Sequence, residues 1–276
     1  MIKYWFQVMV AAVMLLLTSF VQAMTYQASM NYAEWRLELS PFECRMWQPV
    51  PAYGNAVFQY RAGDQQRFFL QPDKPQMRRG KAALVSNPPV WDSSRRQVNF
   101  GHVAVAKGEK TVALTSKLST RLLSELYGGM SPQLTRQSLH SDDVRVTVAL
   151  SSVNFRRAYS QYQQCLAGLL PVNFDQIARS RISFSSAKWQ LTAAAKRRLD
   201  MVVLYVKADP SVSSFFIDGH TDNAGKRLAN LELSKKRAES VMQYLVASGI
   251  DESLITTRYH GQAYPVANNK TAANRA

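Results

Sequence analysis

Residues that could bind a metal ion or a charged ligand are concentrated in one stretch, residues 218 to 238, which reads DGHTDNAGKRLANLELSKKRA. Asp218, His220 and Asp222 alternate along what should be the end of a strand, so their side chains could share one face. Two carboxylates and an imidazole could hold a divalent ion, but no further ligand group has the required spacing. The remaining histidines are scattered: His102, His140 and His260. The spacing disfavours a metal site, and we expect no metal ion.

Catalysis has no positive support in the sequence. No serine, cysteine or threonine is accompanied by the local signature of a base and an orienting group that an activated nucleophile needs. A hydrolase with two paired carboxylates is the remaining enzymatic alternative, and nothing in the sequence favours it. We therefore expect a protein that is not an enzyme and that uses no cofactor.

Asp222 and Arg237 fit a third chemistry, the recognition of a zwitterion. Asp222 ends the expected strand, and Arg237 lies fifteen residues later, where it falls with Asn230 at the border of the apolar stripe of a helix. A carboxylate accepts hydrogen bonds from an ammonium group, and a guanidinium group binds a carboxylate through two hydrogen bonds. A ligand with both groups on one carbon would satisfy both residues. In the alternative interpretation, Asp222 caps the loop and Arg237 is a solvated helix charge.

The elements that must position these residues follow from the periodicity of residues 173 to 276, which we expect to form one domain. The pattern predicts strand, helix, strand, helix and strand, in this order: 181–185, 192–207, 212–220, 228–248 and 255–259. The strand within 212–220 is apolar at 215–217, as a central strand would be. The long helix has one apolar stripe and a glycine placed to end it: Leu228, Leu231, Ala238, Val241, Met242, Leu245 and then Gly249. The order predicts an α+β fold, a βαβαβ sandwich with helices on one face of a small sheet.

The residues of this region resemble the motifs of the OmpA-like peptidoglycan-binding domain, over about residues 180 to 276. They follow in the order and spacing of that family: Gly219-His220-Thr221-Asp222-Asn223, Gly225, Asn230, Leu233-Ser234, Arg237-Ala238, Val241, Leu245, Gly249-Ile250, Gly261, Pro265-Val266-Ala267, Asn269 and Asn274-Arg275. The resemblance implies a site for the diaminopimelate of the wall's peptide stem, with Asp222 and Arg237 as its charged groups. Thr221, Asn223 and Asn230 match positions that line or shape this site.

The resemblance has one departure, at the end of the sequence. The family usually continues after its Asn-Arg pair with a second arginine and a final strand, whereas this sequence stops at Asn274-Arg275-Ala276. Either the sequence is truncated there or the last strand is missing. Both alternatives leave the stability of that sheet edge in question.

Residues 24 to 172 predict a different architecture. Short segments alternate apolar and charged residues as half-buried strands do: 30–40, 56–60, 67–70, 82–85, 98–105 and 144–148. Proline- and glycine-rich segments separate them; a helix is expected at 115–127, and 155–170 is the candidate for a second. The pattern indicates a mostly antiparallel β domain with one or two helices. An outer-membrane barrel is disfavoured because the strands are too few and too short.

The first 23 residues have the pattern of a cleaved signal peptide. Lys3 supplies the positive charge, residues 8–17 form an uncharged apolar core, and Val21-Gln22-Ala23 offers a cleavage site of small residues. The apolar stretch is short for a membrane span of roughly 20 residues, and no cysteine follows it that could carry a lipid. We expect an exported mature chain that begins near Met24 and has no transmembrane segment.

The only two cysteines, Cys44 and Cys165, predict one disulfide in an exported chain. The bridge would close a loop of 121 residues. On the chain-entropy model, closing a loop of this length stabilises the fold by about 4 to 5 kcal/mol. Two buried free thiols are the alternative. The bridge would tie the start of the first domain to its end.

The net charge of the chain is +15, and removal of Lys3 with the signal peptide leaves +14. The basic excess is spread over both expected domains and is not confined to one tail. An exported basic protein meets anionic wall polymers, anionic lipids and acidic protein surfaces before it meets nucleic acid. We therefore expect no nucleic-acid partner.

The first domain resembles the amino-terminal domain of the MotY family, components of the T ring of sodium-driven polar flagellar motors. The segments that carry the resemblance precede Cys165: Pro41-Phe42-Glu43-Cys44, Pro49-Val50-Pro51, Gly54-Asn55-Ala56-Val57-Phe58, Asn87-Pro88-Pro89-Val90-Trp91 and Ala149-Leu150-Ser151-Ser152-Val153. The resemblance implies a periplasmic structural protein beneath the outer membrane, within a ring of many copies. Its first domain would dock on the flagellar basal body and on the partner MotX and would help to collect stator units, while its second would bind peptidoglycan.

Four aromatic residues of the first domain are candidates for its docking surface, since aromatic residues are enriched at interfaces: Trp47, Tyr53, Phe58 and Trp91. Each fits a core position equally well. The alternative function is a general wall-binding protein of the periplasm that tethers the envelope and has no flagellar role.

Overall fold

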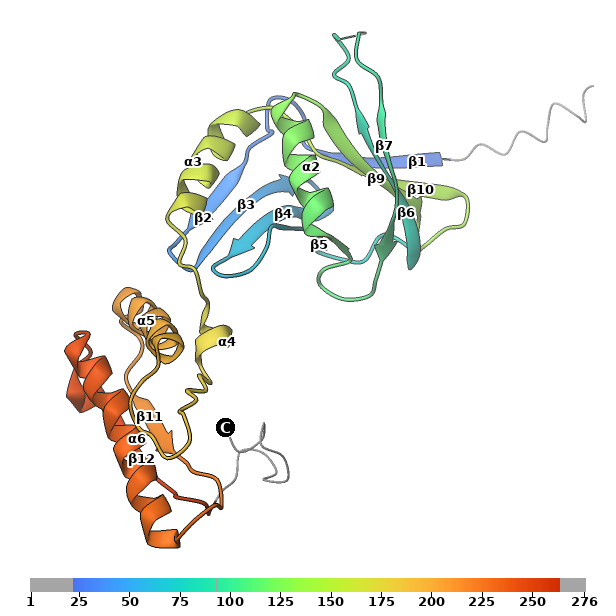
Figure 1. The fold of residues 1–276 in the computed structure, drawn as a ribbon. Coiled ribbons are helices and arrows are strands. Elements are labelled where there is room, and N and C mark those ends of the chain that lie inside the picture. The colour runs from blue at the N-terminus through green and yellow to red at the C-terminus, as the bar shows by residue number, and fades with distance from the viewer. Residues whose placement is uncertain (1–21, 93, 264–276) are drawn as a thin grey trace, which may run out of the picture. The chain divides into compact units, whose positions relative to one another are not determined.

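Figure 1 shows the computed structural model of the chain, which describes residues 22–92 and 94–263. Contacts divide the chain into two compact units. The first holds the residues up to Arg61 together with Gln65–Gly168, and the second holds Ala62–Asp64 and the residues from Leu169 onward. The expected signal peptide lies outside the described residues except for its last two positions, and so does the chain end from residue 264. Across the described ranges, no helix combines the length and apolar character that crossing a membrane requires.

One sheet of the first unit has five strands in the order β1-β10-β9-β6-β7. These strands are β1 (Gln22–Gln27), β10 (Val144–Ala149), β9 (Ser131–Gln137), β6 (Gly80–Asn87) and β7 (Val98–Val105). Every neighbouring pair is antiparallel except β1 with β10, which is parallel. The expectation of a mostly antiparallel β domain is therefore confirmed.

The second sheet of this unit is antiparallel throughout, in the order β2-β3-β4-β5-β8. Its strands are β2 (Arg36–Leu39), β3 (Glu43–Val50), β4 (Gly54–Arg61), β5 (Arg67–Pro72) and β8 (Val112–Leu114). Every second residue of β3 is buried, as in a strand with one face on the core.

Two helices cover the strands of this unit, as the sequence predicts. The first, α2 (Ser116–Tyr127), contacts β5 and β9 and so touches both sheets; Thr115 caps its amino end. The second, α3 (Phe155–Ala167), packs on β2 and β3 and buries Phe155, Ala158 and Tyr162 along one stripe. Helix α3 therefore covers β2 and β3, the first two strands of the second sheet.

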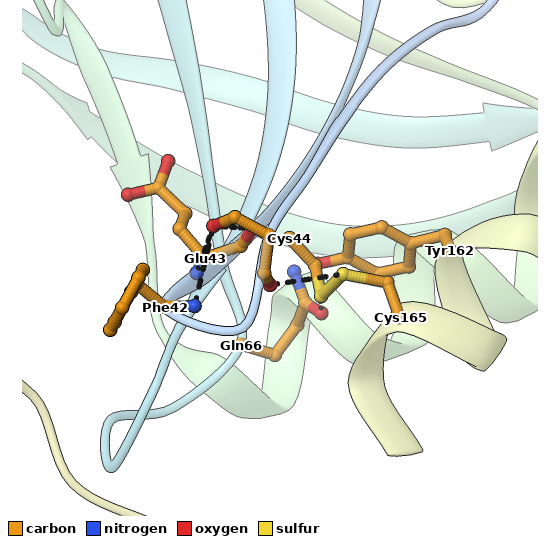
Figure 2. Close-up of a disulfide and its surroundings, with 7 residues drawn as sticks. Phe42, Glu43, Cys44, Gln66, Tyr162 and Cys165 are labelled. Carbon is orange, nitrogen blue, oxygen red and sulfur yellow. Dashed lines mark hydrogen bonds between the residues drawn. A yellow bond between two sulfur atoms is a disulfide. The ribbon is translucent and has the colours of Figure 1, made fainter. Parts of the chain in front are cut away.

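The predicted disulfide between Cys44 and Cys165 is present, with its Cα atoms 6.0 Å apart (Figure 2). It joins β3 to the last turn of α3 within the first unit. Cys44 is wholly buried, and Figure 2 shows Gln66 and Tyr162 beside the bridge. The hydroxyl of Tyr162 donates a hydrogen bond of 2.9 Å to Oε1 of Gln66.

Some expectations for the first unit are wrong in detail. The alternation over residues 30–40 predicts one strand, but β2 occupies only Arg36–Leu39, and Leu39 is exposed. Ala33 and Trp35 are buried ahead of the strand, and Trp35 donates through Nε1 to the carbonyl oxygen of Ser151. The strands β1, β3, β8 and β9 were not expected. Two of them, β3 and β9, each contain a proline, which argues against a strand in the sequence.

Two of the four docking candidates belong to the core. Tyr53 and Phe58 are 1% and 0% exposed, and Phe58 packs on Phe68 with ring centroids 4.8 Å apart. Burial removes both side chains from any docking surface. Trp91 is 72% exposed, and Trp47 is partly buried beneath the guanidinium group of Arg45.

The second unit is built from helices and a short parallel sheet. Its elements are α4 (Phe174–Ile177), α5 (Ala193–Ala208), β11 (Phe215–Gly219), α6 (Arg227–Ala247), the 3₁₀ turn η1 (Glu252–Leu254) and β12 (Ile255–Tyr259). The strands β11 and β12 pair in parallel, with α6 against both. Residues from α5, α6 and the following turn form the core: Leu199, Val203, Val241, Leu245 and Ile250. The α+β class expected for this domain is confirmed.

The first expected strand of this domain, 181–185, is not a strand in the structure. Ile182 and Phe184 pack on the core at alternate positions, which produces the strand-like pattern. The backbone then turns, since the Lys188 amide donates to the Ser185 carbonyl, and Nη2 of Arg237 donates to the same carbonyl. The segment is therefore held by side chains and a turn, with no ladder to another strand among the described residues.

The apolar stripe of α6 also differs from the expectation. Leu228 is 80% exposed and Leu231 is 40% exposed. The buried stripe begins with two polar residues at spacings of four and continues through three apolar ones: Asn230, Ser234, Ala238, Val241 and Leu245. The glycine at 249 ends the helix as expected, with φ of +91°. The amino-terminal half of the buried stripe is therefore polar, and Arg237 lies at the border of this stripe, partly buried.

Candidate functional site

The site begins where β11 meets the middle of α6. Gly219 is the last residue of β11, and a Cβ atom placed on it would lie 2.1 Å from the carbonyl oxygen of Ser234. Only glycine permits this approach of strand to helix. The close contact fixes the point from which the loop carrying Asp222 departs.

The loops that follow β11 and β12 are joined, because parallel strands end at the same edge of a sheet. The amide of His260 donates to the carbonyl of Gly219 at 3.0 Å, and the amide of Thr221 donates to the carbonyl of Gly261 at 2.9 Å. The amide of Gly261 in turn donates to Oγ of Ser234 at 3.0 Å. Two loops and one helix therefore share a continuous hydrogen-bond network.

Asn230 holds the loop of Asp222 from the first turn of α6. Its side chain is 6% exposed, and Nδ2 lies within 3.3 Å of the carbonyl of Asp222, 3.1 Å of that of Ala224 and 2.9 Å of Oε1 of Gln262. A buried amide with these three acceptors sets the backbone path of the loop. Asn230 thus shapes the site from beneath.

Arg237 is clamped by three backbone carbonyls. Its Nε donates to Lys188 at 2.9 Å, Nη1 to His220 at 3.0 Å and Nη2 to Ser185 at 3.3 Å. Its guanidinium group also lies 5.2 Å from the ring centroid of Phe184. Burial lowers the pKa of Arg237, and the nearby charge of Asp222 partly opposes that effect. The guanidinium group is thus a partly desolvated cation in a fixed orientation, so Arg237 is not the solvated helix charge of the alternative interpretation.

Asp222 lies in the loop above this clamp and is partly buried. Its Oδ1 accepts a hydrogen bond of 3.0 Å from the amide of Ala224, which is the loop cap of the alternative interpretation. Among the described residues, no ion pair joins Asp222 to Arg237. The two opposite charges are close enough to interact electrostatically without direct contact.

The other two candidate residues differ in their surroundings. Thr221 is 8% exposed, and its Oγ1 is buried without a hydrogen-bond partner in the described part of the chain. Asn223 is exposed on the loop. The structure therefore brings Thr221, Asp222, Asn230 and Arg237 around one loop, with Asn223 at its outer side.

A second cluster at this edge was not recognised from the sequence. Asp218 accepts two hydrogen bonds from Arg258, at 2.8 and 2.9 Å, and one of 2.8 Å from His260. These partners lower the pKa of Asp218, Arg258 most strongly. The register of β11 and β12 would have revealed this cluster, because it places Asp218 directly opposite Arg258.

The shared face suggested for Asp218, His220 and Asp222 is not formed. Strand β11 ends at Gly219, so the alternation of side chains stops before His220. The ring of His220 instead stacks on that of His260, with centroids 4.9 Å apart. Within the described ranges, no three residues of the metal-binding types lie close enough to hold an ion.

Comparison with protein families divides the chain at the same region as its architecture. Residues 26–171 match the model of the MotY N-terminal domain, and residues 183–276 match the model of the OmpA family. The second match spans the whole site described above.

Individual relatives match the chain over different extents. The sodium-type flagellar protein MotY of Vibrio parahaemolyticus is 30% identical over 254 residues, which are 91% of this chain and 86% of that protein. Outer membrane protein A of Bordetella avium is 38% identical over 93 residues, which are 34% of this chain and 47% of that protein. Among solved structures, the peptidoglycan-associated lipoprotein of Burkholderia pseudomallei has 27% identity and a TM-score of 0.34, over 37% of this chain and 85% of that one. The chain belongs to the MotY family and carries an OmpA-family domain as its second unit.

Proposed function

We propose that this protein is a periplasmic, non-enzymatic component of the flagellar motor that binds the peptidoglycan wall through Asp222 and Arg237. Membership of the MotY family supports the motor role, and the OmpA-family match supports the wall-binding role. The observation that carries the proposal is the state of Arg237, a partly desolvated cation beside a carboxylate with which it makes no ion pair among the described residues.

The ligand is the diaminopimelate of the peptide stem, whose free end carries an ammonium and a carboxylate on one carbon. Arg237 donates three of its five N–H groups to backbone carbonyls, and no acceptor for the other two is found in residues 22–92 and 94–263. Those two groups bind the ligand's carboxylate, and Asp222 accepts from its ammonium through the oxygen that does not cap Ala224. Because the guanidinium group is already oriented, binding costs little side-chain entropy.

The remaining site residues have supporting roles. Asn230 fixes the loop backbone from beneath, and the buried Thr221 supports the same loop through its amide, which donates to the Gly261 carbonyl. Asn223, on the outer side of the loop, contacts the peptide stem. None of these residues supplies a nucleophile or an acid–base pair, so the site binds without reaction.

The first unit docks on the flagellar basal body and on MotX beneath the outer membrane and helps to hold stator units of the sodium-driven motor. Support comes from the match of residues 26–171 to the MotY N-terminal domain. Many copies in one ring make the individual sites multivalent, so moderate affinity at each Asp222–Arg237 site suffices for firm attachment to the wall.

Sedimentation with purified sacculi tests the wall-binding role. The intact protein is expected to pellet with sacculi, and Arg237→Lys is expected to lose about tenfold or more in affinity, because lysine cannot reproduce the planar, doubly donating group. Release of soluble wall fragments by the intact protein would contradict a non-enzymatic role. Undiminished pelleting of both Arg237→Lys and Arg237→Ala would contradict the site.

Purified hook–basal bodies test the motor role. The protein is expected to co-purify with them, and a deletion strain is expected to assemble flagella that do not rotate. Normal swimming of the deletion strain with a leaky or blebbing envelope would instead support a general wall-tethering protein without a flagellar role.

A further inference from the structure

The two cysteines of the disulfide in the first unit differ in their exposure. Cys44 lies on β3 and is 0% exposed, whereas Cys165 lies in the last turn of α3 and is partly exposed. Figure 2 shows Cys44 beside the buried side chains of Gln66 and Tyr162, with Cys165 at the end of the helix. One cysteine of the bridge is therefore partly accessible to solvent, and the other is enclosed.

A groove of about 540 Å³ on the first unit borders this disulfide. Its lining includes Cys165 and excludes Cys44: Leu39, Ser40, Pro41, Gln161, Gln164, Cys165 and Gly168. The carbonyl oxygen of Ser40 lies 3.7 Å from Sγ of Cys165 at the groove wall. These lining residues include no charged side chain, and they offer apolar and amide surface around Cys165.

We infer that Cys165 is a thiol-exchange site of the folded protein, at which a thiolate carried by a peptide attacks while Cys44 remains protected. The groove accommodates the peptide part of the attacking molecule, and its amide side chains, Gln161 and Gln164, provide hydrogen-bonding groups for that peptide. Substrates of this chemical class are small peptide thiols and the exposed cysteine of a dithiol oxidoreductase.

Exchange at Cys165 is a nucleophilic displacement by a thiolate. The incoming thiolate forms a bond to Sγ of Cys165, the bond between Cys165 and Cys44 breaks, and its electron pair passes to the sulfur of Cys44. That sulfur then takes a proton from solvent. A second thiol can attack the mixed disulfide, which releases Cys165 as a thiol and leaves the two external sulfurs joined.

The position of Cys44 makes this exchange slow and reversible. The leaving group is the sulfur of Cys44, which becomes a thiolate beside the buried side chains of Gln66 and Tyr162. Burial disfavours this charged form. Cys44 also remains next to the mixed disulfide, where it can attack again and restore the bridge. The folded protein thus keeps its disulfide unless the external thiol is in excess.

Reduced glutathione, a peptide thiol, is the probe for the test, with the full-length mature protein. The reaction is quenched with acid, the protein is unfolded and free thiols are alkylated, and mass spectrometry then locates the glutathione. We expect the adduct on Cys165, with the alkylating group on Cys44, in at least tenfold excess over the reverse arrangement. Adducts on Cys44, equal labelling of both residues, or no adduct unless the protein is unfolded would overturn the inference.

Charge variants at Gln161 test whether the attack passes through the groove. Gln161 precedes Cys165 by one helical turn on an exposed surface, so substitutions there should leave the fold intact. Glutathione is anionic, so Gln161→Lys should accelerate adduct formation and Gln161→Glu should slow it, by roughly 2- to 5-fold each. Gln163→Lys and Gln163→Glu are the matched controls, because Gln163 is exposed on the same helix but does not line the groove. Equal effects at both positions would contradict passage through the groove.

Discussion

Gly219 and Ser234 are in van der Waals contact across the second unit, so close that a Cβ atom on Gly219 would lie 2.1 Å from the carbonyl oxygen of Ser234. Ser234 also receives the Gly261 amide through its side chain. One helical residue therefore locates both strand ends, and with them the loop of Asp222.

We predict that Gly219→Ala destabilises the second unit by about 1 to 3 kcal/mol, because the added methyl group would force the end of β11 away from the backbone of α6 at Ser234. Thermal unfolding followed by circular dichroism measures the effect. Gly168→Ala is the matched control, since a Cβ there meets its nearest atom at an ordinary 3.6 Å. An unchanged midpoint for Gly219→Ala would show that strand and helix separate easily.

The sequence predicted the elements of the second unit better than their faces. The helix end at Gly249 follows from capping chemistry, which is local, and the structure confirms it; the helix expected from residue 192 is likewise present, with Thr192 as its N-cap. The stripe of α6 was misjudged because Asn230 and Ser234, although polar, are buried by partners on the loops. A hydrophobicity pattern counts such residues as exposed, and only tertiary hydrogen bonds show otherwise.

We predict that Asp222→Asn reduces affinity for sacculi by about tenfold or more while the fold is kept. Asparagine can still accept the Ala224 amide, so the loop cap remains, but the negative charge for the ligand's ammonium is lost. Pelleting at increasing sacculus concentration measures the affinity.

The matched control for this substitution is Asp251→Asn. Asp251 makes the same kind of turn, accepting the Ser253 amide at 2.9 Å, on a different loop. It should pellet as the unsubstituted protein does. A similar loss from both substitutions would indicate a general charge effect, and no loss from Asp222→Asn would remove Asp222 from the site.

The stability of the second unit should depend on acid pH through Asp218. Hydrogen bonds from Arg258 and His260 lower the pKa of Asp218, so its contribution is present above its unfolded pKa, near 3.9, and is lost as pH falls through the lower folded value. Asp218→Asn should therefore lower the unfolding midpoint at pH 7, and the difference from the unsubstituted protein should vanish once the pH has fallen below the folded pKa of Asp218. Parallel midpoint curves for the two proteins across this range would contradict the assignment.

The site itself was predictable only in part. Asp222 and Arg237 are recognisable by residue type, helical spacing and family resemblance, and the structure places them near one another. The clamp on Arg237 was not predictable, because two of its three carbonyl acceptors, those of Ser185 and Lys188, lie about fifty residues earlier in a segment that resembles a strand. Backbone carbonyls have no signature in a sequence.

Loss of the disulfide should destabilise the first unit and leave the second unchanged. Both cysteines belong to the first unit, and opening their loop of 121 residues restores chain entropy worth about 4 to 5 kcal/mol to the unfolded state. Cys44→Ser and Cys165→Ser should each lower the midpoint of one thermal transition by a similar amount, while the transition of the second unit stays in place. The second unit also keeps its site, so both variants should still pellet with sacculi when assayed below the lowered midpoint. A fall in both transitions, or none in either, would show that the bridge does not act within the first unit alone.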